Sequence, residues 1–218
     1  MSDWLTWQIV DSAFPTGIFA HSGGLESAWQ HGEVDGSPAL RRFLEASVHQ
    51  AGHGALPLVN AAFDDPGELE VLDEIADAFL LNAVGNRASR IQGRTLAATA
   101  ARVWPLPALE LLETRVLATA AHAAPVSGAV FRTLGLTRTS TQRVVLFGVA
   151  RGVLSAAVRL GIVGSFEAQG LQAACTPWLD QVAAECADLG PADLAQTAPL
   201  IDILQAGHDR LYSRLFQS

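Results

Sequence analysis

The stretch TSTQRVVLFGVARGVLSAAVRL, residues 139–160, decides the fold. Its apolar side chains would cover most of the circumference of an α-helix, and Arg143, Arg151 and Arg159 interrupt them only every eight residues. A helix that is apolar nearly all round has to be surrounded by other structural elements. We therefore predict a long central helix inside an all-α fold.

Helical patterns recur on both sides of this stretch. Asp65, Pro66 and Glu68 have the arrangement of a capping box, and the apolar residues behind them recur every three or four positions. Ser37 before Pro38 has the form of an N-cap followed by proline in the first turn. Further helical patterns cover roughly residues 4–12, 22–31, 38–51, 88–103, 107–122, 166–174, 178–187, 192–205 and 207–215.

The sequence offers little support for strands. No stretch alternates apolar and polar residues over a convincing length, and no hairpin turn lies between β-branched runs. The chain also has no internal repeat of useful period and no low-complexity linker. We therefore predict one all-α domain, residues 1–218, of about ten helices packed around the apolar central helix.

The charge pattern excludes some classes of function. The formal net charge is −8, and all 14 basic residues are arginines, scattered singly apart from Arg41 and Arg42. Without a basic stripe to neutralise phosphates, a nucleic-acid partner is not expected. A phosphate-binding loop of the Gly-x-x-x-x-Gly-Lys-Ser/Thr type needs a lysine, so another protein would have to hold any nucleotide.

The chain is expected to be soluble and cytoplasmic, with no membrane partner. Its first residues contain no basic region typical of an export signal. The apolar run without charge at residues 116–131 is too short to cross a bilayer and contains His122, Pro125 and Gly128. Two cysteines, Cys175 and Cys186, cannot form a disulfide framework, and their spacing is not that of a metal-binding pair.

Ser22 lies in Ala-His-Ser-Gly-Gly, residues 20–24, which resembles the nucleophile elbow of hydrolases. An elbow needs a strand before the serine, and none is predicted there. The simpler interpretation is that Ser22 is the N-cap of the helix that carries Leu25. Among the carboxylates, Glu68 to Asp77 are clustered, but they lie on the polar side of an amphipathic helix, which is usually solvated.

His49 and His53 are four residues apart, a spacing that one face of a helix can share. Gln50 stands where a zinc protease has its glutamate base. Gly52 and Gly54 indicate that the helix ends here, so we interpret the pair as a solvated helix terminus. The sequence thus predicts no catalytic residue, no metal site and no cofactor.

Two stretches are harder to explain as ordinary loops. Residues 11–26 place three glycines, one proline and two phenylalanines between two predicted helices, which indicates a backbone of defined shape. Residues 208–218 form a terminus rich in leucine, tyrosine, phenylalanine and arginine, the last three being enriched at protein interfaces. A last helix docked on the chain's own core would explain this terminus equally well.

These two stretches resemble the signatures of the urease accessory protein family UreF. The first fits Asp-Ser-x-x-Pro-x-Gly-x-(Phe/Tyr)-x-x-Ser-x-Gly-Leu-Glu from Asp11 to Glu26, and the second fits His followed by Tyr-Ser-Arg-Leu-(Phe/Tyr)-x-Ser from His208 to Ser218. Weaker matches lie between them: Arg87, Ser89, Arg90 and Gly93, and residues 155–159 with Gly164 and Gln169.

The resemblance implies a non-enzymatic helical scaffold for urease maturation. The implied partners are a UreD-type (also called UreH) accessory protein, a UreG-type GTPase that carries nickel, and apo-urease, and homodimerisation is implied as well. We expect the first loop and the C-terminal tail to form the contact surfaces. The expected partner-binding residues are Phe14, Pro15, Gly17, Phe19, His21, Ser22, Leu25, Glu26, His208, Tyr212, Arg214, Leu215 and Phe216.

Two other hypotheses remain open at this point. The protein could carry nickel itself through His21, His208 or Cys186, because imidazole suits nickel, although no local cluster of ligands is visible in the sequence. It could also be a small helical hydrolase that uses Ser22 and a histidine.

Overall fold

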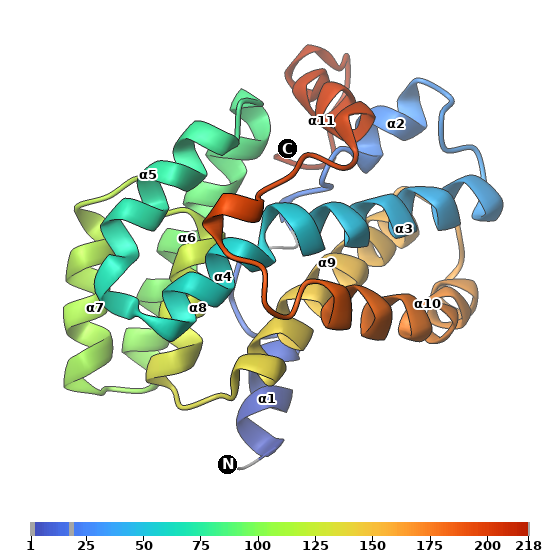
Figure 1. The fold of residues 1–218 in the computed structure, drawn as a ribbon. Helices are drawn as coiled ribbons and strands as arrows, with labels where there is room; N and C mark the ends of the chain where they lie inside the picture. The colour runs from blue at the N-terminus through green and yellow to red at the C-terminus, as the bar shows by residue number, and fades with distance from the viewer. Residues whose placement is uncertain (1–2, 18–19, 218) are drawn as a thin grey trace.

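The computed structural model describes residues 3–17 and 20–217 (Figure 1). In these residues the regular structure consists of eleven α-helices and short 3-10 turns, without a strand, which confirms the predicted all-α fold. The α-helices are α1 (Asp3–Val10), α2 (Leu25–Gln30), α3 (Ser37–Gly54), α4 (Leu56–Asp64), α5 (Leu69–Phe79), α6 (Ala83–Val103), α7 (Pro107–Leu117), α8 (Ala123–Thr133), α9 (Arg138–Arg159), α10 (Ser165–Glu185) and α11 (Pro199–Ala206). The 3-10 turns are η2 (Pro66–Glu68), η3 (Pro191–Asp193) and η4 (His208–Arg210).

The predicted central helix is α9. It runs between the side of the molecule that holds α5 to α8 and the side that holds α2, α3 and α10 (Figure 1). It packs against α1, α2, α3, α4, α8 and α10. By length and composition α9 is the one helix in the described residues that could cross a membrane, and half of its apolar window is buried inside the fold.

The three arginines of α9 leave the helix in different directions. Arg143 pairs with Asp180 of α10 at 3.3 Å, and Arg151 donates to the carbonyl of Val10 at the end of α1. The guanidinium of Arg159 lies 4.2 Å from the ring centroid of Phe216 in the C-terminal tail. Each charge therefore reaches an element that covers the central helix, so the eight-residue spacing connects α9 to α10, α1 and the tail.

Two helices, α4 and α8, were not predicted, although they pack closely on each other. Both are short and mostly buried, so neither shows the apolar and polar faces by which helices are recognised in a sequence. Gly128 of α8 makes the close packing possible. A Cβ at this position would overlap the carbonyl oxygen of Val59 and lie 2.9 Å from the backbone nitrogen of Phe63.

Several predicted boundaries are wrong. The predicted helices 166–174 and 178–187 form the single helix α10, which contains Pro177 and ends at Glu185. Proline deprives the carbonyl four residues earlier of its partner, but both Pro177 and Ala173 are exposed, so water can replace the lost bond. Helix α7 ends at Leu117 and does not reach residue 122. The predicted helices 192–205 and 207–215 are reduced to η3, α11 and η4, followed by a tail without regular structure.

The predicted caps are confirmed in one case of three. Asp65 caps the turn that leads into α5, and its carboxylate accepts from the backbone nitrogen of Gly67 at 2.7 Å. The N-cap of α3 is Gly36, one residue before the predicted Ser37. The N-cap of α2 is Gly24, two residues after the predicted Ser22, and its φ of 90° is one that glycine tolerates best.

Candidate functional site

The two unusual stretches of the sequence meet at the side chain of Glu26. This carboxylate lies on α2 and is only 2% exposed. It accepts a hydrogen bond from Nε2 of His208 at 2.9 Å and from the backbone nitrogens of Leu215 at 2.6 Å and Phe216 at 3.1 Å. One buried acceptor therefore fixes both ends of the tail against the N-terminal part of the chain.

We call residues 20–30 together with residues 207–217 the loop–tail joint. Further contacts hold these two segments together. The backbone nitrogen of Gln217 donates to the carbonyl of Ala20 at 2.8 Å, and Nε2 of Gln30 donates to the carbonyl of Ser213 at 2.9 Å. Gly24 lies directly against α11, where a Cβ would come within 3.2 Å of the Cβ of Gln205. The tail is thus held by α2 on one side and continues from α11 on the other.

The loop before α2 is anchored on a different part of the core. Phe14 is buried, and its ring centroid lies 5.6 Å from that of Trp104. The hydroxyl of Thr99 donates to the carbonyl of Pro15 at 3.0 Å, and Gly17 has a φ of 76°. The predicted site residue Phe19 lies outside the described residues.

Charged groups surround the loop–tail joint. Arg87 of α6 donates to both carboxylate oxygens of Asp209, at 2.9 and 3.1 Å, and this bond lowers the pKa of Asp209. Arg214 approaches the same carboxylate at 3.4 Å. The pKa of His21 is lowered from its ordinary value, first by burial and then by the positive charges of Arg87 and His208.

Part of the tail faces solvent. Tyr212 is fully exposed, and Leu215 is 52% exposed. Arg214 is exposed as well, apart from its contact with Asp209. We call Tyr212, Arg214 and Leu215 the tail surface. The neighbouring helix α11 exposes Leu200 and Ile203. Apolar side chains left in water beside an arginine are the composition expected of a protein interface.

The structure divides the predicted partner-binding residues into two groups. Buried in the described chain are Phe14, His21, Ser22, Leu25, Glu26, His208 and Phe216. Partly or fully exposed are Pro15, Gly17, Tyr212, Arg214 and Leu215. Phe14 and Phe216 already fill this chain's own core, each at 6% exposure. The assignment of partner-binding residues stays a prediction. In this structure the partly or fully exposed residues are the ones available for direct contact with a partner.

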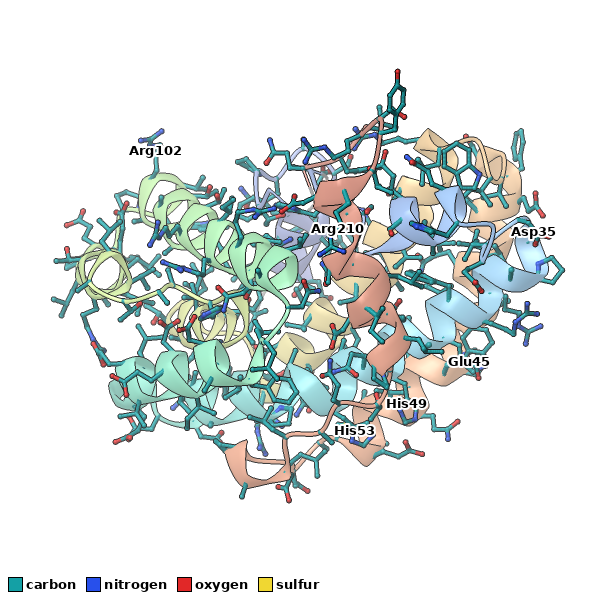
Figure 2. All side chains as sticks on the ribbon, turned by 90° about the horizontal axis from the view of Figure 1, so that it is seen from above. Asp35, Glu45, His49, His53, Arg102 and Arg210 are labelled. Atoms are coloured by element: carbon teal, nitrogen blue, oxygen red, sulfur yellow. The ribbon has the colours of Figure 1, made fainter. Side chains whose placement is uncertain are left out.

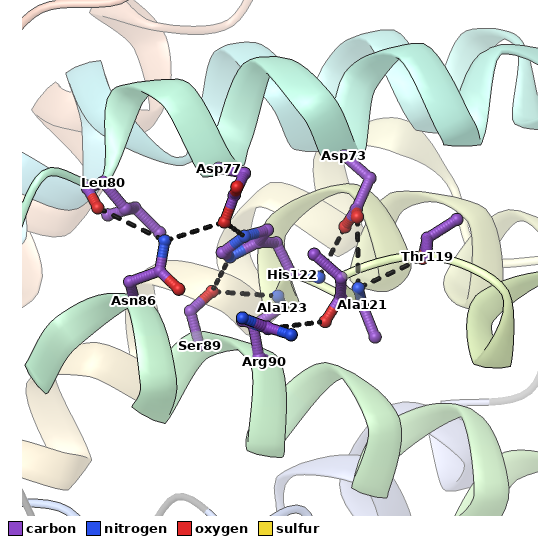
Figure 3. A network of polar contacts seen from close by, with 11 residues as sticks. Asp73, Asp77, Leu80, Asn86, Ser89, Arg90, Thr119, Ala121, His122 and Ala123 are labelled. Carbon is purple, nitrogen blue, oxygen red and sulfur yellow. Dashed lines mark hydrogen bonds and ion pairs between the residues drawn. The ribbon is translucent and has the colours of Figure 1, made fainter. Parts of the chain in front are cut away.

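A second polar network, which the sequence did not predict, holds the turn between α7 and α8 (Figure 3). Asp73 of α5 is 2% exposed and accepts from the backbone nitrogens of Ala121 at 3.1 Å and His122 at 2.6 Å. The interpretation of the whole acidic cluster as a solvated face is therefore wrong for Asp73. A turn in which Ala121 has a φ of 69° needs such a fixed acceptor.

The ring of His122 is fully buried and extends this network. Its Nε2 lies 3.0 Å from Oδ1 of Asp77, and its Nδ1 lies 3.2 Å from Oγ of Ser89. A bond from Asn86 and the contact with His122 lower the pKa of Asp77. Ser89 also accepts from the backbone nitrogen of Ala123 at 3.1 Å. The serine, histidine and aspartate together fix the entrance to α8.

Arg87, Ser89, Arg90 and Gly93, which were noted in the sequence as a weaker motif match, lie in the same region. Nε of Arg90 donates to the carbonyl of Ala120 at 3.3 Å. A Cβ at Gly93 would overlap the carbonyl oxygen of Ala121. The spacing of serine, arginine and glycine in this motif is therefore explained by one turn that packs on α6.

A cavity of about 420 Å³ lies between the two polar regions. Its polar lining includes His21 and Ser22 from the loop–tail joint and Ser89 and His122 from the second network. Arg151 of α9 reaches it as well, and most of the remaining lining is apolar. The cavity connects the two regions within the folded chain.

The structure gives little support to the two alternative hypotheses, a hydrolase that uses Ser22 and a nickel carrier that uses His21, His208 or Cys186. No strand precedes Ser22 in the described residues, so the nucleophile elbow is not formed. Cys186 is fully buried, and burial raises the pKa of its thiol, which disfavours the thiolate needed to bind nickel. His208 uses Nε2 to donate to Glu26.

Comparison with known proteins gives the class to which this arrangement belongs. The sequence model of the UreF family matches residues 34–176. Urease accessory protein F of Oryza sativa subsp. japonica is 36% identical over 219 residues, 98% of this chain and 84% of that protein. The Arabidopsis thaliana protein of the same name is 36% identical over 222 residues, 99% of this chain and 92% of its own length. Urease accessory protein UreF of Mycobacterium tuberculosis (strain ATCC 25618 / H37Rv) is 35% identical over 212 residues, 96% of each chain.

What these relatives have in common is a role as accessory proteins of urease. The chain belongs to the UreF family of urease accessory proteins. The resemblance inferred from the two terminal motifs is thereby confirmed. Family membership implies a role in urease maturation, together with urease and other accessory proteins, and agrees with a protein that is not itself an enzyme.

Proposed function

We propose that this protein is a cytoplasmic scaffold that joins a UreD/UreH-type accessory protein and a UreG-type GTPase to apo-urease for the insertion of nickel. In this proposal the nickel is cargo, and the nucleotide belongs to the GTPase. The absence of lysine from the sequence supports that division, because this chain cannot form a phosphate-binding loop of the common type. Homodimerisation and modulation of the partner GTPase are further parts of the proposal.

One observation carries the proposal: exposed interface-type residues sit on a tail that is held rigidly. Three hydrogen bonds to Glu26 and the buried ring of Phe216 fix the backbone on either side of the tail surface. A surface that is already ordered loses little conformational entropy when a partner binds. Tyr212, Arg214 and Leu215 are therefore suited to direct contact with a partner.

The test is co-purification of the chain with its UreD/UreH-type and UreG-type proteins. Deleting the tail would also remove the core residues His208 and Phe216, so point substitutions are more informative. Tyr212→Ala with Leu215→Ala should reduce recovery of the complex at least tenfold while the chain stays folded. The matched control is Phe166→Ala, which removes an aromatic ring that is 97% exposed on α10.

Arg214→Ala tests the polar part of the same surface. Its contact with Asp209 is a surface ion pair, worth about 0–1 kcal/mol, so the variant should unfold at nearly the wild-type denaturant concentration. A charge-assisted hydrogen bond to a partner is worth about 1.5–3 kcal/mol, so complex recovery should fall about tenfold or more. Normal recovery with the Arg214 and Tyr212/Leu215 variants would place the interface elsewhere.

A further inference from the structure

A group of metal-ligating side chains lies away from the loop–tail joint, where α3 meets α10. It consists of His49 and His53 of α3 and Glu185 of α10, whose ligand atoms all lie within 4.8 Å of one another. The two imidazole rings stack with their centroids 4.9 Å apart. Figure 2 shows both histidines on the same side of α3. Helix α3 ends at Gly54, as the two glycines Gly52 and Gly54 predicted.

The spacing of these side chains is set by a close contact between the two helices. A Cβ at Gly52 would overlap Cγ1 of Val182 and come within 3.0 Å of Sγ of Cys186. Glycine therefore allows α3 and α10 to approach here more closely than another residue would. Gly52 directly precedes His53, and Val182 lies one turn before Glu185. The packing of the helices thus places the carboxylate beside the imidazoles.

Neighbouring hydrogen bonds hold the ligands and the backbone around them. Nε2 of Gln181 donates to Oε1 of Glu185 at 2.8 Å, and the carbonyl of His53 accepts from the backbone nitrogen of Ala195 at 3.2 Å. Gln50 accepts from the backbone nitrogens of Thr197 and Ala198 at 2.7 and 2.8 Å. Such outer contacts orient ligands in known metal sites and contribute to their affinity.

We propose that His49, His53 and Glu185 bind one divalent transition-metal cation, such as Ni²⁺ or Zn²⁺. Two imidazole nitrogens and one carboxylate oxygen suit these ions, whereas Mg²⁺ and Ca²⁺ prefer oxygen ligands. Ligand atoms on one such ion lie about 3.3 Å apart, so rotation of the side chains closes the site without moving either helix. The net charge of −8 also favours a cation. The site is separate from the tail surface and from the proposed scaffold function.

The experiment is calorimetric titration of the tag-free protein with Ni²⁺ and, separately, with Zn²⁺. One equivalent per chain should bind with micromolar or better affinity, and Mg²⁺ should not compete. His49→Ala and His53→Ala should each weaken binding at least tenfold, and the double substitution should abolish it. Glu185→Gln should weaken it about tenfold, and Gln181→Ala less. The matched control is His31→Ala, which removes an exposed histidine at the end of α2 and should leave the affinity unchanged.

Far-ultraviolet circular dichroism shows whether each variant keeps its helices. Wild-type metal affinity in a folded His49→Ala/His53→Ala variant would contradict the proposed metal site. The absence of saturable metal binding by the wild type below 100-fold excess of metal would contradict it as well. Because the titration uses the isolated protein, its outcome does not depend on whether the accessory complex forms.

Discussion

The carboxylate of Glu26 joins two segments that are almost the whole chain apart in sequence. It receives one side-chain and two backbone hydrogen bonds, all from the residues between His208 and Phe216. A buried acceptor with three donors organises the tail, because each donor would lose its partner if the carboxylate were removed. This gives a structural reason for a glutamate at the end of the first motif and a histidine at the start of the last.

Glu26→Ala should lower the free energy of unfolding by about 3 kcal/mol, because it leaves buried donors without an acceptor. It should also increase hydrogen exchange at the backbone amides of Leu215 and Phe216. Chemical denaturation and exchange measured by mass spectrometry test the two effects. Glu33→Ala, which removes an exposed carboxylate shortly after α2, is the control. Unchanged exchange in the tail of Glu26→Ala would show that the tail is held by other contacts.

His21 should make stability depend on pH. Its pKa in the folded chain lies below the ordinary value of 6.5, so below that pH the unfolded chain binds a proton that the folded chain does not. The free energy of unfolding should therefore fall as the pH is lowered from about 7 towards 5. In His21→Asn this slope should become smaller. Equal slopes in His21→Asn and the wild type would contradict the assignment.

The sequence predicts a helix well where the helix is packed against neighbouring elements on most of its sides. The central helix α9 was placed within one residue at each end, because its apolar side chains recur along most of its length and pack against several neighbouring helices. Helices α4 and α8 escaped prediction because short buried helices carry no polar face. The tail was mistaken for a helix because its leucines and aromatics follow helical spacing, while its backbone is fixed by bonds to Glu26.

Gly128→Ala should separate α4 from α8 and destabilise the fold. The added methyl group would overlap the backbone of α4, which cannot move aside as a side chain can. We expect a loss of about 2–3 kcal/mol in the free energy of unfolding, measured by urea denaturation. Gly170→Ala is the matched control in α10, where a Cβ meets nothing within 4 Å, and it should be neutral or slightly stabilising. Equal stability of the two variants would contradict the close packing of α4 on α8.

At the scale of the whole molecule, the sequence identified the two segments of the candidate site but not their geometry. The motifs named Glu26, His208 and Phe216, yet only the fold brings them together, because the pairing spans 190 residues. The same limit explains why the network around Asp73 and His122 was missed. A buried aspartate on an acidic helix has no local signal that separates it from its solvated neighbours.

The central claim is that the rigidly held tail surface contacts another protein during urease maturation. The most direct measurement is nickel-dependent urease activity in a host that makes urease and the other accessory proteins but depends on this chain. Tyr212→Ala/Leu215→Ala should lower urease activity at least tenfold at normal levels of folded protein, while Phe166→Ala should keep it. Full urease activity with the Tyr212→Ala/Leu215→Ala variant would contradict the claim.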